Sequence, residues 1–394
     1  MIDILRKHKR FFILIFIIII GGFLRFYKLD WGQGLYAHPD EYHIVGSVAQ
    51  LSFPTQMHPH FFSYGTVTIY LIYLTQELLN FFFSSLNPSS PAGGSELLIP
   101  NSFILGRFYS ALFSTLTIII VYKICRSFME RRFSYLAAFL VALTPGLIQQ
   151  AHFATPESAL TFFLLLSLSL IMKFLKSNKI FYLILASVSL GFALGVKISS
   201  IVFLLPLTIT ILLKSYSKNA SLLKNAVKMI LKFIGLALVS LMVTIATFVL
   251  VAPYVFLDYQ AFRSNVDYEG GLAIGKIPVF YTRQFINTIS VLFHIEKILP
   301  YALGPVLLIS SAVGFFLLIF NLIKKPKLEL IILFVAFITL FISSSFLFAK
   351  WTRFIVPTLP FFAILTVFFL QELKSISKPY LIRQECFYFL QRCF

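Results

Sequence analysis

Residues 6–26 read RKHKRFFILIFIIIIGGFLRF, in which a basic cluster is followed by an apolar run whose only charge is Arg25. About 20 helical residues cross the hydrocarbon core of a bilayer, which is about 30 Å thick, and this run approaches that length. No small-x-small cleavage site follows Gly21 and Gly22, so we expect a membrane anchor that stays in the chain rather than a cleaved signal peptide. The basic flank predicts a cytoplasmic N-terminus.

The whole chain has the composition of a membrane protein. Its 394 residues are 59% hydrophobic and only 12% charged, and 47 of them are phenylalanine. A mean hydropathy of +0.89 excludes a soluble globular protein, because one core could not hide so much apolar surface. The apolar runs are uniform rather than alternating, which favours helices over a β-barrel. We therefore predict an all-α polytopic membrane protein.

The distribution of basic residues orders the spans. Together with the first helix, the positive-inside rule gives a bundle of about ten transmembrane helices with both termini in the cytoplasm. The other nine spans are expected at about 103–124, 134–152, 158–175, 180–196, 198–213, 230–256, 299–321, 329–348 and 354–371.

One further apolar run, 64–86, is long enough to span but contains Gln76, Glu77 and Asn80. If it crossed the bilayer, the basic residues between 126 and 132 would lie outside, against the usual charge bias. We therefore expect this run to lie on the outer membrane surface or to dip into it.

This topology separates the charges. The cytoplasmic loops hold 23 of the 33 basic residues and 5 of the 15 acidic ones, so the net charge of +18 lies on that side. The pI of 9.8 then reflects topology and contact with membrane lipids, and no nucleic-acid partner is expected. We predict one transmembrane domain, 1–371, with long outer loops 27–102 and 257–298, and a short cytoplasmic tail, 372–394.

Chemistry is therefore expected at the outer face, where residues 37–45 read AHPDEYHIV. Pro39 suits the first position of a helix, and Asp40 and Glu41 would then lie beside the positive end of its dipole. Capping alone would explain both acids. The functional alternative is that one of them is a general base. Neighbours are about 100° apart on a helix, so only one of the two can point into a given site.

The same pattern recurs in residues 154–158, ATPES. Thr155 is expected to cap a helix that begins at Pro156, which places Glu157 at the outer mouth of a span. Helix capping is again the structural alternative to a catalytic role. The two acids at positions 40 and 157 could converge within a bundle.

Four of the ten basic residues assigned to the outer side stand out, namely Arg107, Lys197, Lys350 and Arg353. They either snorkel to lipid headgroups or bind a lipid-linked phosphate. The outer histidines His38, His58 and His60 could ligate zinc or another divalent metal, although their spacing is not diagnostic. No cofactor is certain from the sequence.

Several of these motifs together resemble the membrane glycosyltransferases of the GT-C fold, in particular glycosyltransferase family 39 and the aminoarabinose-transferase-like group. The resemblance covers residues 1 to about 370 in the family's order. It rests on Arg25, His38 to Glu41, Pro59 to Gly65, Arg107, Ala154 to Glu157, Gly191 to Lys197, Ala252 to Tyr254 with Asp258, and Arg353 to Pro357 followed by Pro360.

The resemblance implies transfer of a sugar from a polyprenyl-phosphate carrier to an acceptor protein, lipid or glycan at the outer face of the cell membrane, by a single displacement with inversion. Asp40 would be the base and Glu41 its acidic partner, with Glu157 as a further acid. Arg107, Lys197, Lys350, Arg353 and Tyr64 would line the substrate site.

Two departures from the family pattern stand out. The family has Tyr-Pro where this chain has Tyr64-Gly65, and the tail 372–394 is either naturally short or truncated. Two other functions stay open. A transporter would be expected to show two similar halves, whereas a flippase for lipid-linked glycans would share the carrier-binding cations but have no need for Asp40.

Overall fold

The computed structural model describes residues 2–86, 101–216 and 223–375. Helices make up nearly all of its regular structure, and the described residues contain no β-sheet, only an isolated bridge between Ser52 and Gln56. The prediction of an all-α protein is confirmed. The elements are α1 (Ile2–Phe26), α2 (Pro39–Ala49), α3 (Thr66–Leu86), α4 (Ser102–Cys125), α5 (Arg131–Leu143), α6 (Pro145–Ala151), α7 (Glu157–Ser177), α8 (Ile180–Val196), η1 (Ile198–Phe203), α9 (Leu204–Ser215), α10 (Leu223–Val251), α11 (Tyr254–Leu257), α12 (Tyr259–Ala273), η2 (Phe280–Phe285), α13 (Ser290–Phe293), the π-helical turn η3 (His294–Ile298), α14 (Leu299–Leu303), α15 (Pro305–Lys324), α16 (Leu328–Ser345), α17 (Thr352–Ile355) and η4 (Val356–Thr358), the last two opening an apolar helical span that reaches Ser375.

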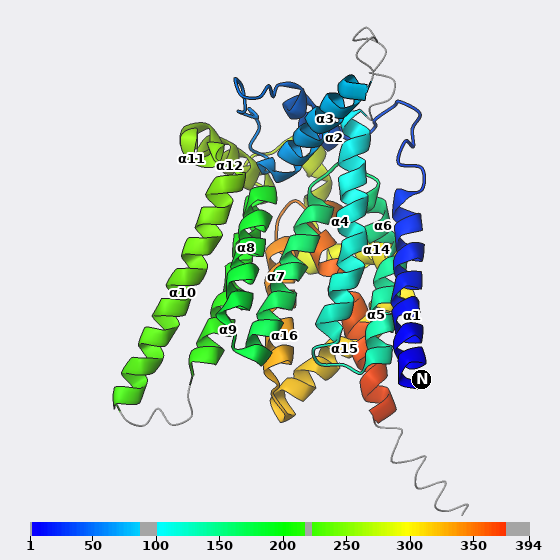
Figure 1. The fold of residues 1–394 in the computed structure, drawn as a ribbon, viewed down its shortest axis with the longest axis vertical. Coiled ribbons are helices and arrows are strands. Elements are labelled where there is room, and N and C mark those ends of the chain that lie inside the picture. Colours follow the sequence, from blue (N-terminus) through cyan, green and yellow to red (C-terminus); the bar gives the residue numbers. More distant parts are fainter. Residues whose placement is uncertain (1, 87–100, 217–222, 376–394) are drawn as a thin grey trace, which may run out of the picture.

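Most of these helices run side by side along the long axis of the molecule (Figure 1). In the described residues, eight helices are long and apolar enough to cross a membrane, or nine if the bent pair α5–α6 is one span, and α1 and α8 are shorter apolar helices beside them. One of the eight is α3, but it lies obliquely across the end of the bundle next to α2, as expected for residues 64–86 (Figure 1). Apart from α3, the seven other long helices among the described residues, the bent pair α5–α6 and the shorter helices α1 and α8 lie at the positions of the ten predicted spans.

Three predicted boundaries differ from the structure, each at a proline or glycine. The span expected at 134–152 bends by 55° between α5 and α6, because Thr144 is extended before Pro145. The span expected at 299–321 is broken at Gly304, whose φ of +81° suits only glycine. The long helix α10 ends at Val251 instead of continuing to 256, because Pro253 follows.

The start of α7 also corrects the sequence prediction. The helix begins at Glu157 with Pro156 in the capping position, and the Thr155 side chain makes no capping hydrogen bond. By contrast, α2 begins at Pro39 as predicted.

Arg25 fastens α1 to the bundle. Its guanidinium is fully buried and donates hydrogen bonds to Ser114 Oγ at 2.7 Å and to the carbonyl oxygens of Gly21, Val141 and Ala142 at 2.9, 3.0 and 2.8 Å. The last two carbonyls lie in the final turn of α5, where the bend before α6 removes their helical partners. The side chain therefore caps the broken helix as well as joining three helices.

We expect Arg25→Met to destabilise the protein by about 2 kcal/mol or more, because buried carbonyls of α5 lose their donors. The measurement is the thermal unfolding midpoint in detergent, which should fall by several degrees. Arg263→Met is the matched control, since the Arg263 side chain is 68% exposed in an ion pair with Asp267. Equal midpoints for the two variants would contradict the capping role.

Candidate functional site

The sequence-predicted residues gather at the end of the bundle opposite the N-terminus of the chain, where α2 and α3 lie (Figure 1). Five segments meet there: the start of α2, the residues before α3, the start of α7, the turn after α8 and the start of α17.

The start of α2 directs its two acids to different places. His38 caps the helix, because its side chain accepts a hydrogen bond from the Asp40 backbone N–H at 3.3 Å. Glu41 is fully buried, whereas the Asp40 side chain remains 14% exposed. The two carboxylates have different partners, as expected from the 100° rotation between helical neighbours.

Glu41 forms a buried two-point ion pair with Arg107 of α4. The guanidinium donates from Nε to Oε1 at 2.8 Å and from Nη2 to Oε2 at 2.9 Å, and neither side chain is exposed. Arg107 Nη1 donates to the carbonyls of Leu29 and Trp31, and Glu41 Oε1 also accepts from the Ala154 N–H at 2.7 Å. The pair therefore joins α2, α4 and the segment before α7, and its polar atoms are already occupied.

Asp40 lies against Arg353, 313 residues later in the chain. Arg353 Nη1 donates to Asp40 Oδ2 and, at 3.0 Å, to the hydroxyl of Tyr64. Burial would raise the pKa of Asp40, but the charge and hydrogen bond of Arg353, with smaller effects of Tyr64 and His38, outweigh it, so the pKa lies below its usual value. The two positions thus share one end of the protein, as the predicted topology requires.

A second charge pair adjoins the first through Tyr64. Lys197 Nζ donates to Glu157 Oε1 at 3.2 Å and lies 5.4 Å from the centre of the Tyr64 ring. Lys197 can reach both because α8 ends there in extended backbone, with φ −159° and ψ 121°. We call Asp40, Tyr64, Glu157, Lys197 and Arg353 the charged cluster.

Two glycines allow Tyr64 and Lys197 to approach each other. The N–H of Gly65 donates to the carbonyl of Val196 at 2.9 Å, and a Cβ on Gly65 would lie 1.9 Å from the carbonyl oxygen of Gly195. A Cβ on Gly195 would lie 2.8 Å from Val67 Cγ2 at the start of α3 and 2.3 Å from Val251 Cγ2 at the end of α10. Glycine at position 65, which departs from the family pattern, is therefore required by the close packing of two backbones.

Lys350 has its contacts within its own segment and with Phe285. It is 3% exposed, donates to the carbonyl of Phe348 at 2.9 Å, and lies over the rings of Phe285 and Phe348. Burial lowers the pKa of Lys350. Trp351, which stacks on Arg353, follows it in the chain. The structure therefore brings Arg353, but not Lys350, to Asp40.

The outer histidines lie in two places. His38 Nδ1 is 3.9 Å from Asp40 Oδ2, while His58 Nε2 lies 3.2 Å from Asp258 Oδ2 and His60 Nε2 lies 2.6 Å from Gln56. Among the described residues, no three His, Cys, Asp or Glu side chains are placed to hold a metal ion. Metal dependence stays a prediction, which activity after exhaustive chelation would test.

The loop that contains α12 is joined to the residues before α3 by contacts that the sequence did not predict. Besides the His58–Asp258 contact, Ser63 donates to Glu269 Oε1 at 2.9 Å, and Asn265 donates to the Ser63 hydroxyl at 3.3 Å. These bonds tie α12 to the residues just before Tyr64. Only Asp258 had a sequence signal, through the family motif.

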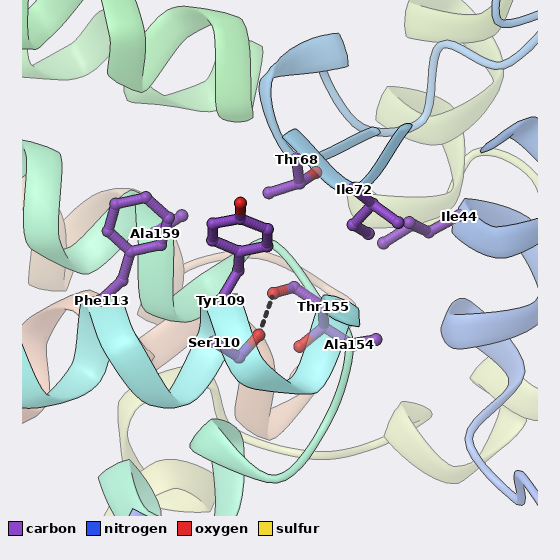
Figure 2. Close-up of a pocket in the computed structure, with 10 residues that line it drawn as sticks. Ile44, Thr68, Ile72, Tyr109, Ser110, Phe113, Ala154, Thr155 and Ala159 are labelled. Carbon is purple, nitrogen blue, oxygen red and sulfur yellow. Dashed lines mark hydrogen bonds between the residues drawn. The ribbon is translucent and has the colours of Figure 1, made fainter. Parts of the chain in front are cut away.

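A small, mostly apolar pocket of about 10 Å³ lies between α2, α3, α4 and the start of α7 (Figure 2). Figure 2 shows the Ser110 hydroxyl donating to the Thr155 carbonyl, at 3.1 Å, on its wall. The hydroxyls of Thr68 and Thr155 line the pocket without a partner. None of its lining residues belongs to the charged cluster, so we do not place the reacting groups there.

We expect Gly65→Ala to separate Tyr64 from Lys197, because the new Cβ has no space beside the Gly195 carbonyl. Thermal stability should fall, and any activity of the charged cluster should fall with it. Gly46→Ala in α2 is the control, since nothing lies within 4 Å of its Cβ position and alanine favours the helix. A Gly65→Ala variant as stable as Gly46→Ala would contradict the packing argument.

Known proteins match this chain in sequence over part of its length and in structure over most of it. A family model described as dolichyl-phosphate-mannose-protein mannosyltransferase matches residues 94–245, which include Arg107, Glu157 and Lys197 but neither Asp40 nor Arg353. No curated protein matches the chain by sequence.

Solved structures extend the likeness. The oligosaccharyltransferase of Archaeoglobus fulgidus in the apo form matches with a TM-score of 0.61 and 13% identity, over 97% of this chain and 52% of that one. ArnT from Cupriavidus metallidurans bound to undecaprenyl phosphate matches with a TM-score of 0.61 and 16% identity, over 90% of this chain and 59% of that one. The archaeal oligosaccharyltransferase AglB from Archaeoglobus fulgidus, in complex with an inhibitory peptide and a dolichol-phosphate, matches with a TM-score of 0.59 and 14% identity, over 97% and 52%.

This chain therefore spans between half and three fifths of the length of these proteins. At identities this low the likeness shows the fold alone. This fold agrees with the resemblance noted in the sequence. The chain is a polytopic membrane protein with the GT-C fold of membrane glycosyltransferases.

Proposed function

We propose that this protein transfers a sugar from a polyprenyl-phosphate carrier to an acceptor hydroxyl, with Asp40 as the general base. The observation that carries the proposal is the charged cluster, in which a partly exposed carboxylate and two cations surround Tyr64. The undecaprenyl phosphate bound to ArnT and the dolichol-phosphate bound to AglB support a lipid phosphate as carrier.

The chemistry follows from what each group can do. Asp40 accepts the proton of the acceptor hydroxyl as that oxygen attacks the anomeric carbon of the sugar. The bond from this carbon to the carrier phosphate breaks in the same step, so the configuration inverts. The leaving phosphate gains negative charge, which the fixed cations Arg353 and Lys197 stabilise in a site shielded from bulk water.

Arg353 couples donor binding to the strength of the base. In the unliganded cluster it lowers the pKa of Asp40, which keeps the carboxylate ionised but makes it a weak base. A donor phosphate competes with Asp40 for the Arg353 guanidinium. The lowering effect of Arg353 on the pKa of Asp40 is then weaker, so burial raises this pKa. Donor binding thus makes Asp40 more basic at the moment when it must accept a proton.

The outer side of the cell membrane is the proposed location of the reaction. The basic connections 126–132 and 324–327 lie at the end of the bundle where α5 begins and α15 ends, opposite the charged cluster (Figure 1). The positive-inside rule assigns that basic end to the cytoplasm. The termini would then lie in the cytoplasm, although residues 376–394, with Cys386 and Cys393, are outside the described part.

The remaining predicted residues have supporting roles in this proposal. Glu41 and Arg107 hold α2 in place, because their hydrogen-bonding groups serve each other and nearby backbone. Lys350 fixes the segment before α17 through the Phe348 carbonyl. A flippase would use the same cations for the carrier phosphate, but it gives no reason for a carboxylate held against one of them.

Asp40→Asn is expected to lower sugar transfer by about 10²- to 10⁴-fold, because the amide cannot accept the proton. The measurement is transfer from polyprenyl-phosphate sugars to acceptors in membranes that lack the wild-type protein. Asp267→Asn, an exposed carboxylate on α12, serves as control and should keep its activity. Wild-type turnover by Asp40→Asn would reject the base assignment.

The pH profile tests the link between Arg353 and Asp40. In the wild type the acid limb of kcat/KM should lie below the usual range of an aspartate, because Asp40 loses activity only when it is protonated at its lowered pKa. In Arg353→Gln, burial is opposed only by the smaller effects of Tyr64 and His38, so this limb should move to higher pH, while the donor KM rises. An unchanged acid limb would show that another group controls it.

A further inference from the structure

Two buried polar atoms in the charged cluster have no hydrogen-bond partner, namely Glu157 Oε2 and Arg353 Nε. Glu157 is 1% exposed, and only its other oxygen is engaged, by Lys197. Arg353 uses Nη1 for both Asp40 and Tyr64. One free acceptor and one free donor therefore remain in the same cluster.

Such atoms are costly in a folded protein. Burying a polar group without a partner loses its hydrogen bonds to water with nothing in return, so native structures satisfy nearly all such groups. The contacts from Glu157 to Lys197, from Lys197 to the Tyr64 ring and from the Tyr64 hydroxyl to Arg353 place the two side chains with unpaired atoms in one cluster. An occupant that satisfies both must carry a hydrogen-bond donor for the carboxylate and an acceptor for the guanidinium.

We propose that Glu157 Oε2 accepts a hydrogen bond from a hydroxyl of the donor's sugar, while Arg353 Nε donates to its phosphate. This inference rests on the proposed function and assigns Glu157 to sugar recognition rather than proton transfer. A glycosyl phosphate has the required groups next to each other, because its hydroxyls donate and its phosphate oxygens accept.

The position of Glu157 fits recognition better than catalysis. Its carboxylate is held by Lys197 and is almost fully buried, whereas the Asp40 side chain is 14% exposed and can meet an incoming acceptor. A buried acceptor left unpaired also gives strong selectivity, because a ligand without the matching hydroxyl leaves it unsatisfied. Lys197 links Glu157 to the rest of the charged cluster, since it donates a hydrogen bond to Glu157 and contacts the Tyr64 ring.

The test compares lipid phosphates with and without a sugar, using the full chain in detergent. The probes are farnesyl phosphate and its mannosyl, glucosyl and galactosyl derivatives, with binding measured by calorimetry. Glu157→Gln keeps the shape of the side chain and an oxygen for Lys197. We expect it to weaken the best-bound sugar derivative about 10-fold relative to the wild type, and farnesyl phosphate less than about 2-fold.

Matched variants separate this role from a structural one. Arg353→Lys should weaken farnesyl phosphate and its sugar derivatives alike, whereas Asp40→Asn should leave the preference for sugar derivatives intact. Retained binding of farnesyl phosphate shows that the Glu157→Gln protein is folded. A further series, in which the preferred sugar lacks one hydroxyl at a time, should contain one analogue that Glu157→Gln and the wild type bind equally.

Three outcomes would overturn the inference. They are an equal loss for farnesyl phosphate and its sugar derivatives in Glu157→Gln, no loss for either, or a wild type that gains no affinity from any of the three sugars. The base assignment can fail separately, since full turnover by Asp40→Asn together with selective loss in Glu157→Gln would reject only the role of Asp40.

Discussion

The buried ion pair between Glu41 and Arg107 is the interaction on which the site depends. Two charges removed from water are stable only if both are fully hydrogen-bonded, and here carbonyls of the first loop and the Ala154 N–H complete their shells. This pair holds α2 against α4 and the segment before α7. Because Asp40 directly precedes Glu41, the clamp that buries one acid also directs the other toward Arg353.

Close backbone packing supplies the second half of the site. Gly65 and Gly195 let the start of α3 touch the end of α8, and extended backbone at Lys197 turns its side chain toward Tyr64. Membrane helices have no hydrophobic drive to associate within lipid, so small residues and interhelical hydrogen bonds are what brings them together. Hydrogen bonds between helices also serve where a helix is broken, since Arg25 of α1 donates to the carbonyls at the end of α5.

Asp40, Arg353, Lys197 and Glu157 form two linked acid–base pairs rather than one acidic centre. In each pair a phosphate could compete with the carboxylate for the cation, since guanidinium and ammonium groups bind both kinds of anion. Binding of a glycosyl phosphate would therefore rearrange hydrogen bonds that already exist, instead of creating charges in a dry site. Because each carboxylate is paired with a cation, a chain that is only 12% charged can hold these five polar side chains together at one end of its bundle.

The sequence by itself determined the class of protein, the approximate positions of the apolar helices and the start of α2 at Pro39, because hydropathy and helix-start preferences are local. It also pointed to Asp40 and Glu157 through helix-start patterns and to Lys197 and Arg353 through charge bias, and the family motifs contain all four.

Only the tertiary structure decided which of these side chains meet. Lys350 and Arg353 looked equivalent in sequence, but the chain between them turns Lys350 toward Phe348 and Arg353 toward Asp40. Glu41 and Arg107 looked like site residues and proved to be partners of each other. Long-range pairing depends on how ten helices pack, and no local pattern of residues encodes the distance between positions 40 and 353.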